Sequence, residues 1–291
     1  MKNLILLLLF ALILGCKETP KKEVSTPITH FETRDYVVVG QMFDTIKTPY
    51  IIDVKNGNKR IVFIGCDHQM PDTHPQFKAI ETYFNALKPQ ITFNEGGQWA
   101  DSIRFKTIKA AILRGGESAI LKYFSDSIGI KIMNGDMSDS LQFAYTSRYH
   151  TQEEWYLYYM IERSIIPYFF GKGKNEPLDS VFSKDAKGYF TRNGFKMTPE
   201  QLTFNHFKTV YKKYMGKAFE RNNFDMEAFD YVNPNCHFCA IGRTSKIVRD
   251  SVLLTKVDKA LDTYDRVMVT FGHGHALAIE PALRQIIERK R

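Results

Sequence analysis

The sequence predicts an α/β fold with a mainly parallel central sheet, flanked by helices and carrying an inserted helical subdomain. Two regions, 60–133 and 244–289, alternate short apolar runs with segments of helical periodicity. This alternation is typical of parallel strands joined by helices. Between these regions, from about 139 to 230, strand signals are absent and aromatic residues crowd at helical spacing.

The first half of the predicted sheet starts with a hairpin of two strands, at 36–42 and 49–54. Residues 60–65 form the next strand, a short run rich in β-branched and aromatic side chains that we expect to be buried. Apolar residues then recur at helical spacing until Pro89, which predicts a helix that packs through Phe77, Ile80, Phe84 and Leu87.

A second strand follows at 90–94, and strand–helix–strand at this length predicts a parallel pair. Two helices are then expected, around 102–113 and 117–127, before a strand at 130–133. These elements complete the first half of the α/β domain.

The rest of the chain is predicted to be helical until its last strand. The helical insert has its aromatic helix within 143–170 and a further helix at 199–214. A long helix at about 244–263 then leads back to a strand at 266–271 and a final helix at 276–289.

These patterns divide the chain into five segments. Residues 1–15 are a signal peptide, and 16–34 form a lipidated flexible tether. Residues 35–138 and 241–291 are the two halves of the α/β domain, and 139–240 are the helical insert between them.

The N-terminus has the features of a bacterial lipoprotein signal. Lys2 precedes an apolar run of 11 residues from Leu4 to Leu14, and the small residue Gly15 precedes Cys16. Eleven helical residues span roughly 16 Å, about half of a bilayer core, so the run is too short for an ordinary transmembrane helix. The Ile-Leu-Gly-Cys stretch resembles a lipobox, which predicts cleavage before Cys16 and a lipid on that cysteine.

Ordinary secretion with an unmodified Cys16 is the alternative. The residues after Cys16 are charged, include Pro20 and lack apolar periodicity, so they predict a flexible tether. Lys17 stands where an Asp would favour retention in the inner membrane. We therefore expect a lipid-anchored protein of the bacterial cell envelope, on the outer membrane.

Charge and composition limit the classes of binding partner that we expect for this protein. The chain has 40 Lys and Arg against 32 Asp and Glu, a formal net charge of +8, and both signs are spread along it. No nucleic-acid-binding motif is present, so we expect no nucleic-acid partner. The expected partners are the membrane, through the lipid anchor, and a peptide or small-molecule substrate.

Three cysteines remain besides the anchor: Cys66, Cys236 and Cys239. The last two have the spacing Cys-x-x-Cys. A single such pair, without a second, is weak evidence for zinc. A local disulfide or two reduced thiols is the favoured interpretation, and export makes a disulfide possible.

One motif occurs twice, near opposite ends of the chain. An apolar strand, then Gly-x-x-His, then a helix is found at Gly65 to His68 and again at Gly272 to His275. A lone His is more often structural than functional. Because the motif recurs in the same context, and ligands of parallel α/β sheets bind beyond the carboxyl ends of strands, the pair favours a site. His273 is interpreted as a variable position of the motif.

Two carboxylates also follow predicted strands of the sheet. Glu95 comes after the strand at 90–94, and Asp136 after the strand at 130–133. Asp after Gly also makes ordinary turns, which is the alternative for Asp136. We expect both carboxylates to converge with His68 and His275 at one rim of the sheet.

These residues resemble those of a known family. Paired Gly-x-x-His motifs ending at His68 and His275, Glu95 after the strand between them, and Arg249 on the helix before the second motif resemble the TraB/Tiki group. That group shares a superfamily with erythromycin esterase-like enzymes and the ChaN haem-binding lipoproteins. The family more often has Asn where Asp250 follows the arginine, and the helical middle of this chain matches nothing in it.

The resemblance implies a sheet whose two motif ends lie side by side, with a helical insert over the site. Tiki proteins are metal-dependent peptidases, so it also implies hydrolysis of amide or ester bonds. His68, Glu95 and His275 suit a divalent metal such as Mn, Zn or Co, which would lower the pKa of a bound water towards ~7. Arg249 would stabilise an oxyanion, and Asp136 is a further catalytic candidate.

Two alternatives remain open. The erythromycin esterase-like relatives imply a metal-free hydrolase in which His and Glu act as general base and acid. No Gly-x-Ser-x-Gly motif is present, which argues against a serine hydrolase. The ChaN relatives imply a haem- or iron-binding lipoprotein, with Tyr149, His150 and the aromatic helix 152–170 around the haem. An aromatic stripe at helical spacing is more often core.

Overall fold

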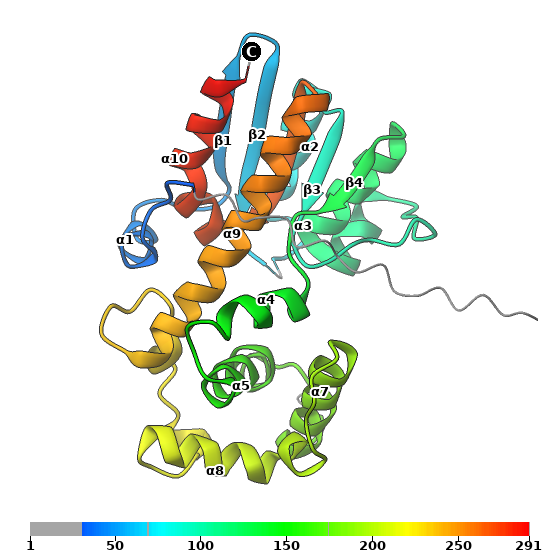
Figure 1. The fold of residues 1–291 in the computed structure, drawn as a ribbon. Coiled ribbons are helices and arrows are strands. Elements are labelled where there is room, and N and C mark those ends of the chain that lie inside the picture. Colours follow the sequence, from blue (N-terminus) through cyan, green and yellow to red (C-terminus); the bar gives the residue numbers. More distant parts are fainter. Residues whose placement is uncertain (1–30, 69, 174, 291) are drawn as a thin grey trace, which may run out of the picture.

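The computed structural model describes residues 31–68, 70–173 and 175–290 (Figure 1). The predicted signal peptide, the lipidated Cys16 and most of the tether lie outside these residues. Within the described ranges, no helix is both long enough and apolar enough to cross a membrane.

The predicted α/β class is confirmed, with a five-stranded sheet at the centre. Its strands are β1 (Tyr50–Asn56), β2 (Lys59–Cys66), β3 (Ile91–Asn94), β4 (Lys131–Asn134) and β5 (Arg266–Gly272). The order across the sheet is β1-β2-β5-β3-β4. Only β1 is antiparallel to its neighbour, so the carboxyl ends of the other four strands share one edge.

Helices cover both faces of the sheet (Figure 1). One face is packed by α1 (Tyr36–Met42), α9 (His237–Thr263) and α10 (His273–Arg289). The other face is packed by α2 (Pro75–Leu87) and α3 (Ile108–Ser127). The sheet is thus the middle layer of three, as a mainly parallel sheet requires.

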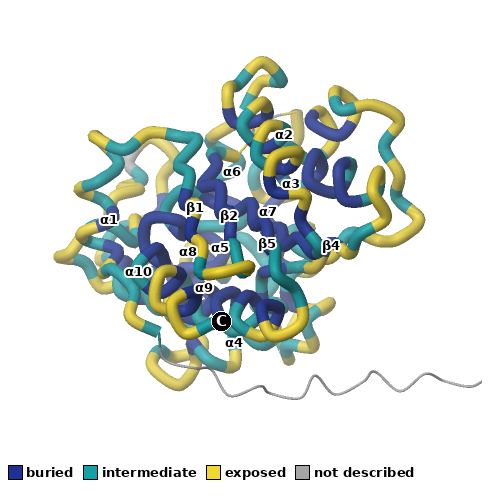
Figure 2. Tube along the Cα trace, turned by 90° about the horizontal axis from the view of Figure 1, so that it is seen from above, coloured by how far each residue is buried: buried dark blue, intermediate teal, exposed yellow. Residues whose placement is uncertain are grey.

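The central strands explain why both faces are covered. Side chains alternate along a strand, so on β2 Ile61 and Phe63 join the core under α10, while Val62 and Ile64 join the core under α2 and α3. All four are completely buried. Figure 2 shows the central strands dark blue, enclosed by partly exposed helices.

One predicted strand is wrong, because 36–42 form helix α1. The Val-rich stretch has strand propensity, but Asp35 caps a helix by accepting a hydrogen bond from the Val37 amide. Tyr36 and Val39, one turn apart, are buried in the core cluster shared with α10. Tertiary packing therefore overrides local propensity here. The hairpin exists, but it pairs β1 with β2.

Two predicted helices are joined in the structure. The expected helices at 102–113 and 117–127 are the single element α3, which starts at Ile108 and kinks at Gly115 and Gly116. Gly116 has φ +56, which favours glycine, and its neighbour Gly115 leaves room for Trp99. The break between the predicted helices was therefore correctly located, although both belong to one element.

The insert between β4 and α9 contains helices only, within the residues described. The α-helices are α4 (Asp139–Thr146), α5 (Gln152–Met160), α6 (Ile166–Phe169), α7 (Leu178–Arg192) and α8 (Phe204–Met215). A π-helix, η1 (Ile161–Ile165), joins α5 to α6. Three short 3₁₀ segments complete the insert: η2 (Glu200–Leu202), η3 (Arg221–Asn223) and η4 (Glu227–Phe229). The pattern did not predict α7.

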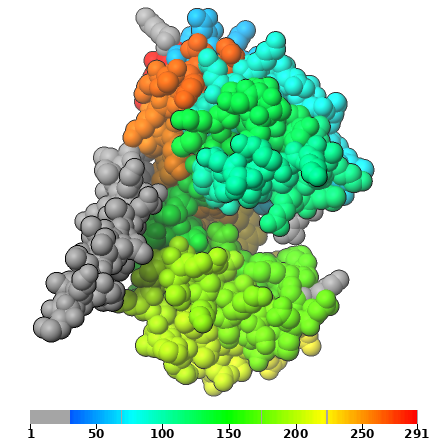
Figure 3. All heavy atoms as spheres, turned by 90° about the vertical axis from the view of Figure 1, so that its right-hand side faces the viewer, coloured from blue at the N-terminus to red at the C-terminus, as the bar shows by residue number. Residues whose placement is uncertain are grey.

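Aromatic side chains form a separate core inside the insert. Trp155, Tyr158 and Tyr159 are buried together with phenylalanines of α7 and α8. Figure 3 shows the insert as a body below the α/β domain, with a hollow between them on the face drawn. The aromatic residues of α5 are thus core, whereas Phe170 at the end of the stripe is exposed.

The last two helices begin earlier than predicted. Helix α9 starts at His237 with Cys236 as its cap, seven residues before the expected 244. Helix α10 starts at His273 rather than at 276, so His275 lies in its first turn. This places the second Gly-x-x-His motif on the junction of β5 and α10, at the carboxyl edge of the sheet.

Candidate functional site

The structure brings the predicted site residues together at one edge of the sheet. His68 follows β2, Glu95 follows β3, Asp136 follows β4, and His275 follows β5. His68 Nε2 lies 3.6 Å from Glu95 Oε2, and His275 Nε2 lies 3.9 Å from Glu95 Oε1. Arg249 reaches this group from α9, with Nη2 2.5 Å from Glu95 Oε1.

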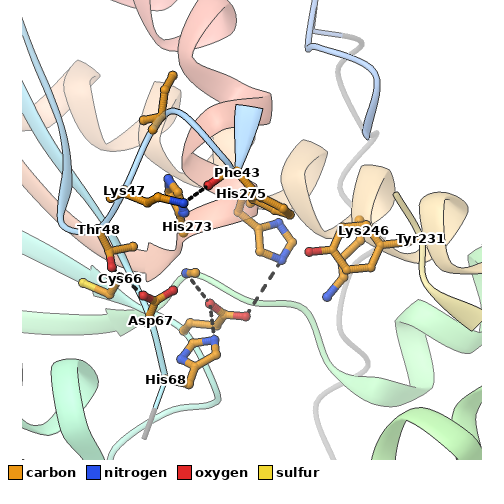
Figure 4. A pocket seen from close by; sticks show the side chains of 14 residues that line it. Phe43, Lys47, Thr48, Cys66, Asp67, His68, Tyr231, Lys246, His273 and His275 are labelled. Atoms are coloured by element: carbon orange, nitrogen blue, oxygen red, sulfur yellow. Dashed lines mark hydrogen bonds and ion pairs between the residues drawn. The ribbon is translucent and has the colours of Figure 1, made fainter. Parts of the chain in front are cut away.

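A cavity of about 440 Å³ opens beside these residues. His68, Glu95 and His275 line it. Figure 4 shows His68, His275 and Lys246 projecting toward it from different segments. The rest of its wall combines apolar, basic and acidic side chains, including Phe43, Ile46, Lys47, Asp67, Tyr231, Lys246 and His273.

Arg249 and Asp136 do not line this cavity, which corrects the expectation that they would face a substrate. The Arg249 guanidinium is buried and donates to both oxygens of Asp136, at 2.7 and 2.6 Å, as well as to Glu95. With these donors engaged, Arg249 is not free to stabilise an oxyanion. Its role is to hold the two carboxylates in place.

Charge balance keeps this buried group ionised. Burial raises the pKa of the Glu95 carboxyl, but Arg249 and His68 outweigh burial and hold that pKa below its ordinary value. The same competition between burial and Arg249 lowers the pKa of Asp136. Burial opposes the charge of Arg249 too, yet Asp136 and Glu95 raise its pKa well above the ordinary value.

His68 also contacts a second carboxylate, which belongs to α3. Its Nδ1 lies 2.6 Å from Oε1 of Glu117, a buried carboxylate in α3 just after the kink. The hydrogen bond to Glu117 raises the pKa of His68, although partial burial opposes the shift. The side chain stays half exposed, with Nε2 toward Glu95.

His275 has the opposite character. It is buried, and its Nδ1 lies 2.5 Å from Oδ1 of Asp250. Tyr36 donates a hydrogen bond to the other oxygen of Asp250, at 2.7 Å. Burial lowers the pKa of His275 well below its ordinary value, and the positive charges of Arg249 and Lys246 add to the effect. The imidazole is therefore neutral.

The second nitrogen of His275 is one of two buried imidazole nitrogens at the cavity that lack a partner among the described residues, and His273 Nε2 is the other. His275 Nε2 makes no hydrogen bond with any described residue, although buried polar atoms are normally paired. Nε2 lies 3.9 Å from Glu95 Oε1, which is too long for a hydrogen bond between the two atoms. A ring proton on Nδ1, which lies within hydrogen-bonding distance of Asp250 and Tyr36, leaves Nε2 as an acceptor.

The three residues expected to bind a metal do not form a ligand set in this arrangement. Arg249 occupies Oε1 of Glu95, and the Gly272 amide donates to Oε2 at 2.6 Å. In the described parts of the chain, no three His, Cys, Asp or Glu side chains are grouped to hold one metal ion. We therefore derive no step through a metal.

Four residues of the site were missed by sequence reasoning. Glu117, Asp250 and Tyr36 contact the histidines, and Lys246 lines the cavity. Asp250 follows Arg249 directly and stood out only as a departure from the family pattern. Glu117 and Tyr36 carry no local signal, because tertiary folding brings them to the site.

Lys246 adds a positive charge to the cavity wall. Its ammonium lies 4.8 Å from the centre of the Tyr231 ring and 3.7 Å from Glu162 Oε1. Burial lowers the pKa of Lys246, while Glu162 opposes that shift. The ammonium of Lys246 is thus a poorly solvated hydrogen-bond donor at the edge of the cavity.

Gly272 leaves room for the convergence of these side chains. A Cβ atom at this position would lie 3.1 Å from Glu95 Oε2 and 3.3 Å from His68 Nε2. Gly272→Ala is expected to lower kcat/KM of any reaction that uses Glu95 and His68, since both side chains would have to move by a few tenths of an ångström. Crowding of the buried carboxylate should lower the free energy of unfolding by about 1–3 kcal/mol.

Steady-state kinetics and urea unfolding of Gly272→Ala check this expectation. Gly188→Ala is the matched control, because Gly188 lies within α7 and a Cβ there meets only the flexible end of Arg192. Full activity in Gly272→Ala would show that the spacing of Glu95 and His68 does not matter.

The residues expected around haem are placed as follows. The aromatic residues of α5 are buried in the core of the insert, Phe170 and Tyr149 are exposed, and His150 Nε2 lies 3.0 Å from Thr244 Oγ1. A cavity of about 250 Å³ borders α5 and is lined by Gln152, Glu153, Tyr156, Met197, Gln201 and His206. Of the remaining cysteines, Cys236 and Cys239 form a disulfide and Cys66 is a buried free thiol. The local disulfide is one of the two states expected from the sequence.

Comparisons with family models, with curated proteins and with solved structures found no match to this chain.

Proposed function

We propose that the chain is a lipid-anchored hydrolase of amide or ester bonds in the bacterial cell envelope, with His275 as the base that activates water. One observation supports this most strongly. The Nε2 atom of His275 is buried beside a cavity with no hydrogen-bond partner among the described residues, while Asp250 contacts the ring at Nδ1. An imidazole oriented through Nδ1 by an Asp side chain is the arrangement that general-base catalysis uses. Burial raises the pKa of Asp250 well above its ordinary value, while the hydrogen bond from Tyr36 and the charges of Arg249 and Lys246 oppose that shift.

In the proposed reaction, a water between His275 and Glu95 attacks the substrate carbonyl. The water oxygen forms the new bond to carbon, its proton passes to Nε2 of His275, and the carbonyl electrons move to the oxygen. His68, kept protonated by Glu117, gives a proton to the leaving nitrogen or oxygen as the bond to carbon breaks. Lys246 stabilises the negative charge that develops on the carbonyl oxygen.

The two histidines suit these separate roles because their surroundings shift their pKa values apart. Glu117 raises the pKa of His68, and burial lowers that of His275. Paired titratable groups with opposite shifts are typical of acid–base catalysis. The resemblance to the TraB/Tiki group supports hydrolysis, whereas the metal dependence of Tiki proteins is not part of the proposal.

Turnover tests the proposal directly. The purified mature protein should hydrolyse members of a library of peptides and esters, and treatment with a chelator should leave the rate unchanged. Restored activity on adding Mn, Zn or Co after chelation would contradict activation of water by His275 alone. A visible absorption band of haem, with no turnover of any substrate, would replace the proposal with the haem-binding alternative.

The pH profile is expected to be bell-shaped. His275 must be neutral, so kcat/KM should fall as the pH drops through its pKa, which burial has placed below the ordinary ~6.5. His68 must be charged, so kcat/KM should fall as the pH rises through its pKa, which Glu117 has placed above ~6.5. His68→Gln should remove the alkaline limb and keep the acidic one, whereas an unchanged alkaline limb would exclude His68 as the acid.

The anchor is tested separately. Cys16→Ser is expected to abolish lipid modification and to leave an uncleaved precursor or a soluble product. Membrane fractionation and mass spectrometry of the N-terminal peptide measure the outcome. Complete partition of the variant into membranes would contradict lipidation of Cys16.

A further inference from the structure

The disulfide at the start of α9 has no part in the proposed hydrolase. Cys236 caps this helix of 27 residues, and its Sγ lies 3.2 Å from the backbone N of Cys239. The two residues differ in access, because Cys236 is partly exposed and Cys239 is completely buried. The more accessible residue of the pair therefore caps the helix N-terminus, and the buried one lies in the first turn of the helix.

Stabilisation is a weak explanation for this bond. A disulfide removes chain entropy from the unfolded state in proportion to the logarithm of the loop that it closes, and here the cysteines are only three residues apart. The start of α9 is also held without the bond, since Phe238 and Ile241 are buried in the core of the insert. The bond ties together two residues that the helix already keeps close.

The position of Cys236 favours a thiolate. After reduction, its sulfur would face the Cys239 amide and the positive end of the α9 dipole, and both stabilise a negative charge. Both sulfurs also lie against carbonyl oxygens, with Cys236 Sγ 3.2 Å from that of Ala228 and Cys239 Sγ 3.3 Å from that of Glu227, so the amide and the dipole are what distinguish Cys236. The Glu227 oxygen accepts a hydrogen bond from a protonated thiol, so the reduced form of Cys239 has a partner in place.

We propose that Cys236 and Cys239 form a thiol–disulfide exchange site whose substrate is a pair of cysteine thiols on another exported protein. A partner thiolate attacks Sγ of Cys236, the more accessible residue, and the bond to Cys239 breaks. Cys239 leaves as a thiolate and takes up a proton. The second partner thiolate then attacks the mixed disulfide and releases Cys236, so that two electrons have passed from the partner to this chain.

The exchange is balanced, because one dithiol of the partner becomes a disulfide while the disulfide of this chain becomes a dithiol. It does not depend on the hydrolase activity. The asymmetry of the two cysteines makes the proposal specific, because the mixed disulfide must form at Cys236.

Single-cysteine variants of the full mature chain test the asymmetry, with oxidised glutathione as the disulfide probe. Cys239→Ser leaves Cys236, which should form the mixed disulfide at least about tenfold faster than Cys239 does in Cys236→Ser. The pH dependence of the rate should give Cys236 a pKa below the ordinary ~8.5. Cys66, buried in every variant, is the internal reference for an unreactive thiol.

A measurement on the unaltered chain covers the case in which a variant does not fold. Dithiothreitol should reduce the disulfide reversibly under native conditions, with the helical circular dichroism unchanged, and a short dithiol peptide should then be oxidised by the reoxidised protein. A disulfide that dithiothreitol reduces only when the chain unfolds would overturn the proposal. Equal reactivity of Cys236 and Cys239, or a Cys236 pKa at or above ~8.5, would overturn it too.

Discussion

Replacing Arg249 with methionine is expected to lower the free energy of unfolding by about 3–5 kcal/mol at neutral pH. The guanidinium is buried and pairs with Glu95 and Asp136 at 2.5–2.7 Å. Methionine keeps much of the aliphatic volume but removes the charge, so two buried carboxylates lose their counter-ion. Removing one partner of a buried ion pair lowers the free energy of unfolding by more than the intact pair adds to it, because the remaining charge stays desolvated.

Urea unfolding at several pH values measures this effect. Arg249 holds the pKa values of both carboxyls below their ordinary ~4, which stabilises the wild type above that pH, and the stabilisation is lost as the pH falls through the lowered values. The difference between variant and wild type should therefore shrink on acidification. Lys78→Met, at a solvent-exposed ion pair with Glu81, is the control and should lower the free energy of unfolding by about 1 kcal/mol or less. A loss that does not depend on pH would contradict this account.

Replacing His275 with asparagine is expected to lower kcat/KM by about 10²–10⁴-fold. The amide of asparagine can still donate to Asp250, as Nδ1 of the imidazole does, so the local hydrogen bond is kept. No atom then occupies the position of Nε2, and the base is lost. The free energy of unfolding should change far less than in Arg249→Met.

His206→Asn is the matched control for this loss. His206 lies in α8 of the insert, where its ring packs on Tyr156, and it has no contact with the cavity of His275. Its substitution should leave kcat/KM unchanged. A His275→Asn variant with wild-type turnover would remove His275 from the mechanism.

The fold class was predictable because strand and helix patterns are local. The apolar run at 60–65 and the helical spacing up to Pro89 depend on neighbouring residues, and both elements are present as β2 and α2. The segment 36–42 was not predictable, since its valines favour a strand in isolation. Burial of Tyr36 and Val39 against α10, more than 230 residues away, decides its structure.

The candidate site was partly predictable for a geometric reason. Parallel strands place their carboxyl ends on one edge, so residues that follow different strands meet there. This brought His68, Glu95 and His275 together. Which side chains face the cavity was not predictable, because it depends on the ion pairs that draw Arg249 inward and on Glu117, a helix residue with no motif.

The protonation state of His275 tests the central claim most directly. ¹⁵N NMR of protein labelled at histidine, recorded from neutral pH down to pH ~5, distinguishes protonated from unprotonated ring nitrogens, and the His275→Asn variant assigns the signal. The account predicts a neutral ring at pH 7, with its proton on Nδ1 and Nε2 unprotonated, that stays neutral below the ordinary pKa of ~6.5. A proton on Nε2 at pH 7 would contradict His275 as the base.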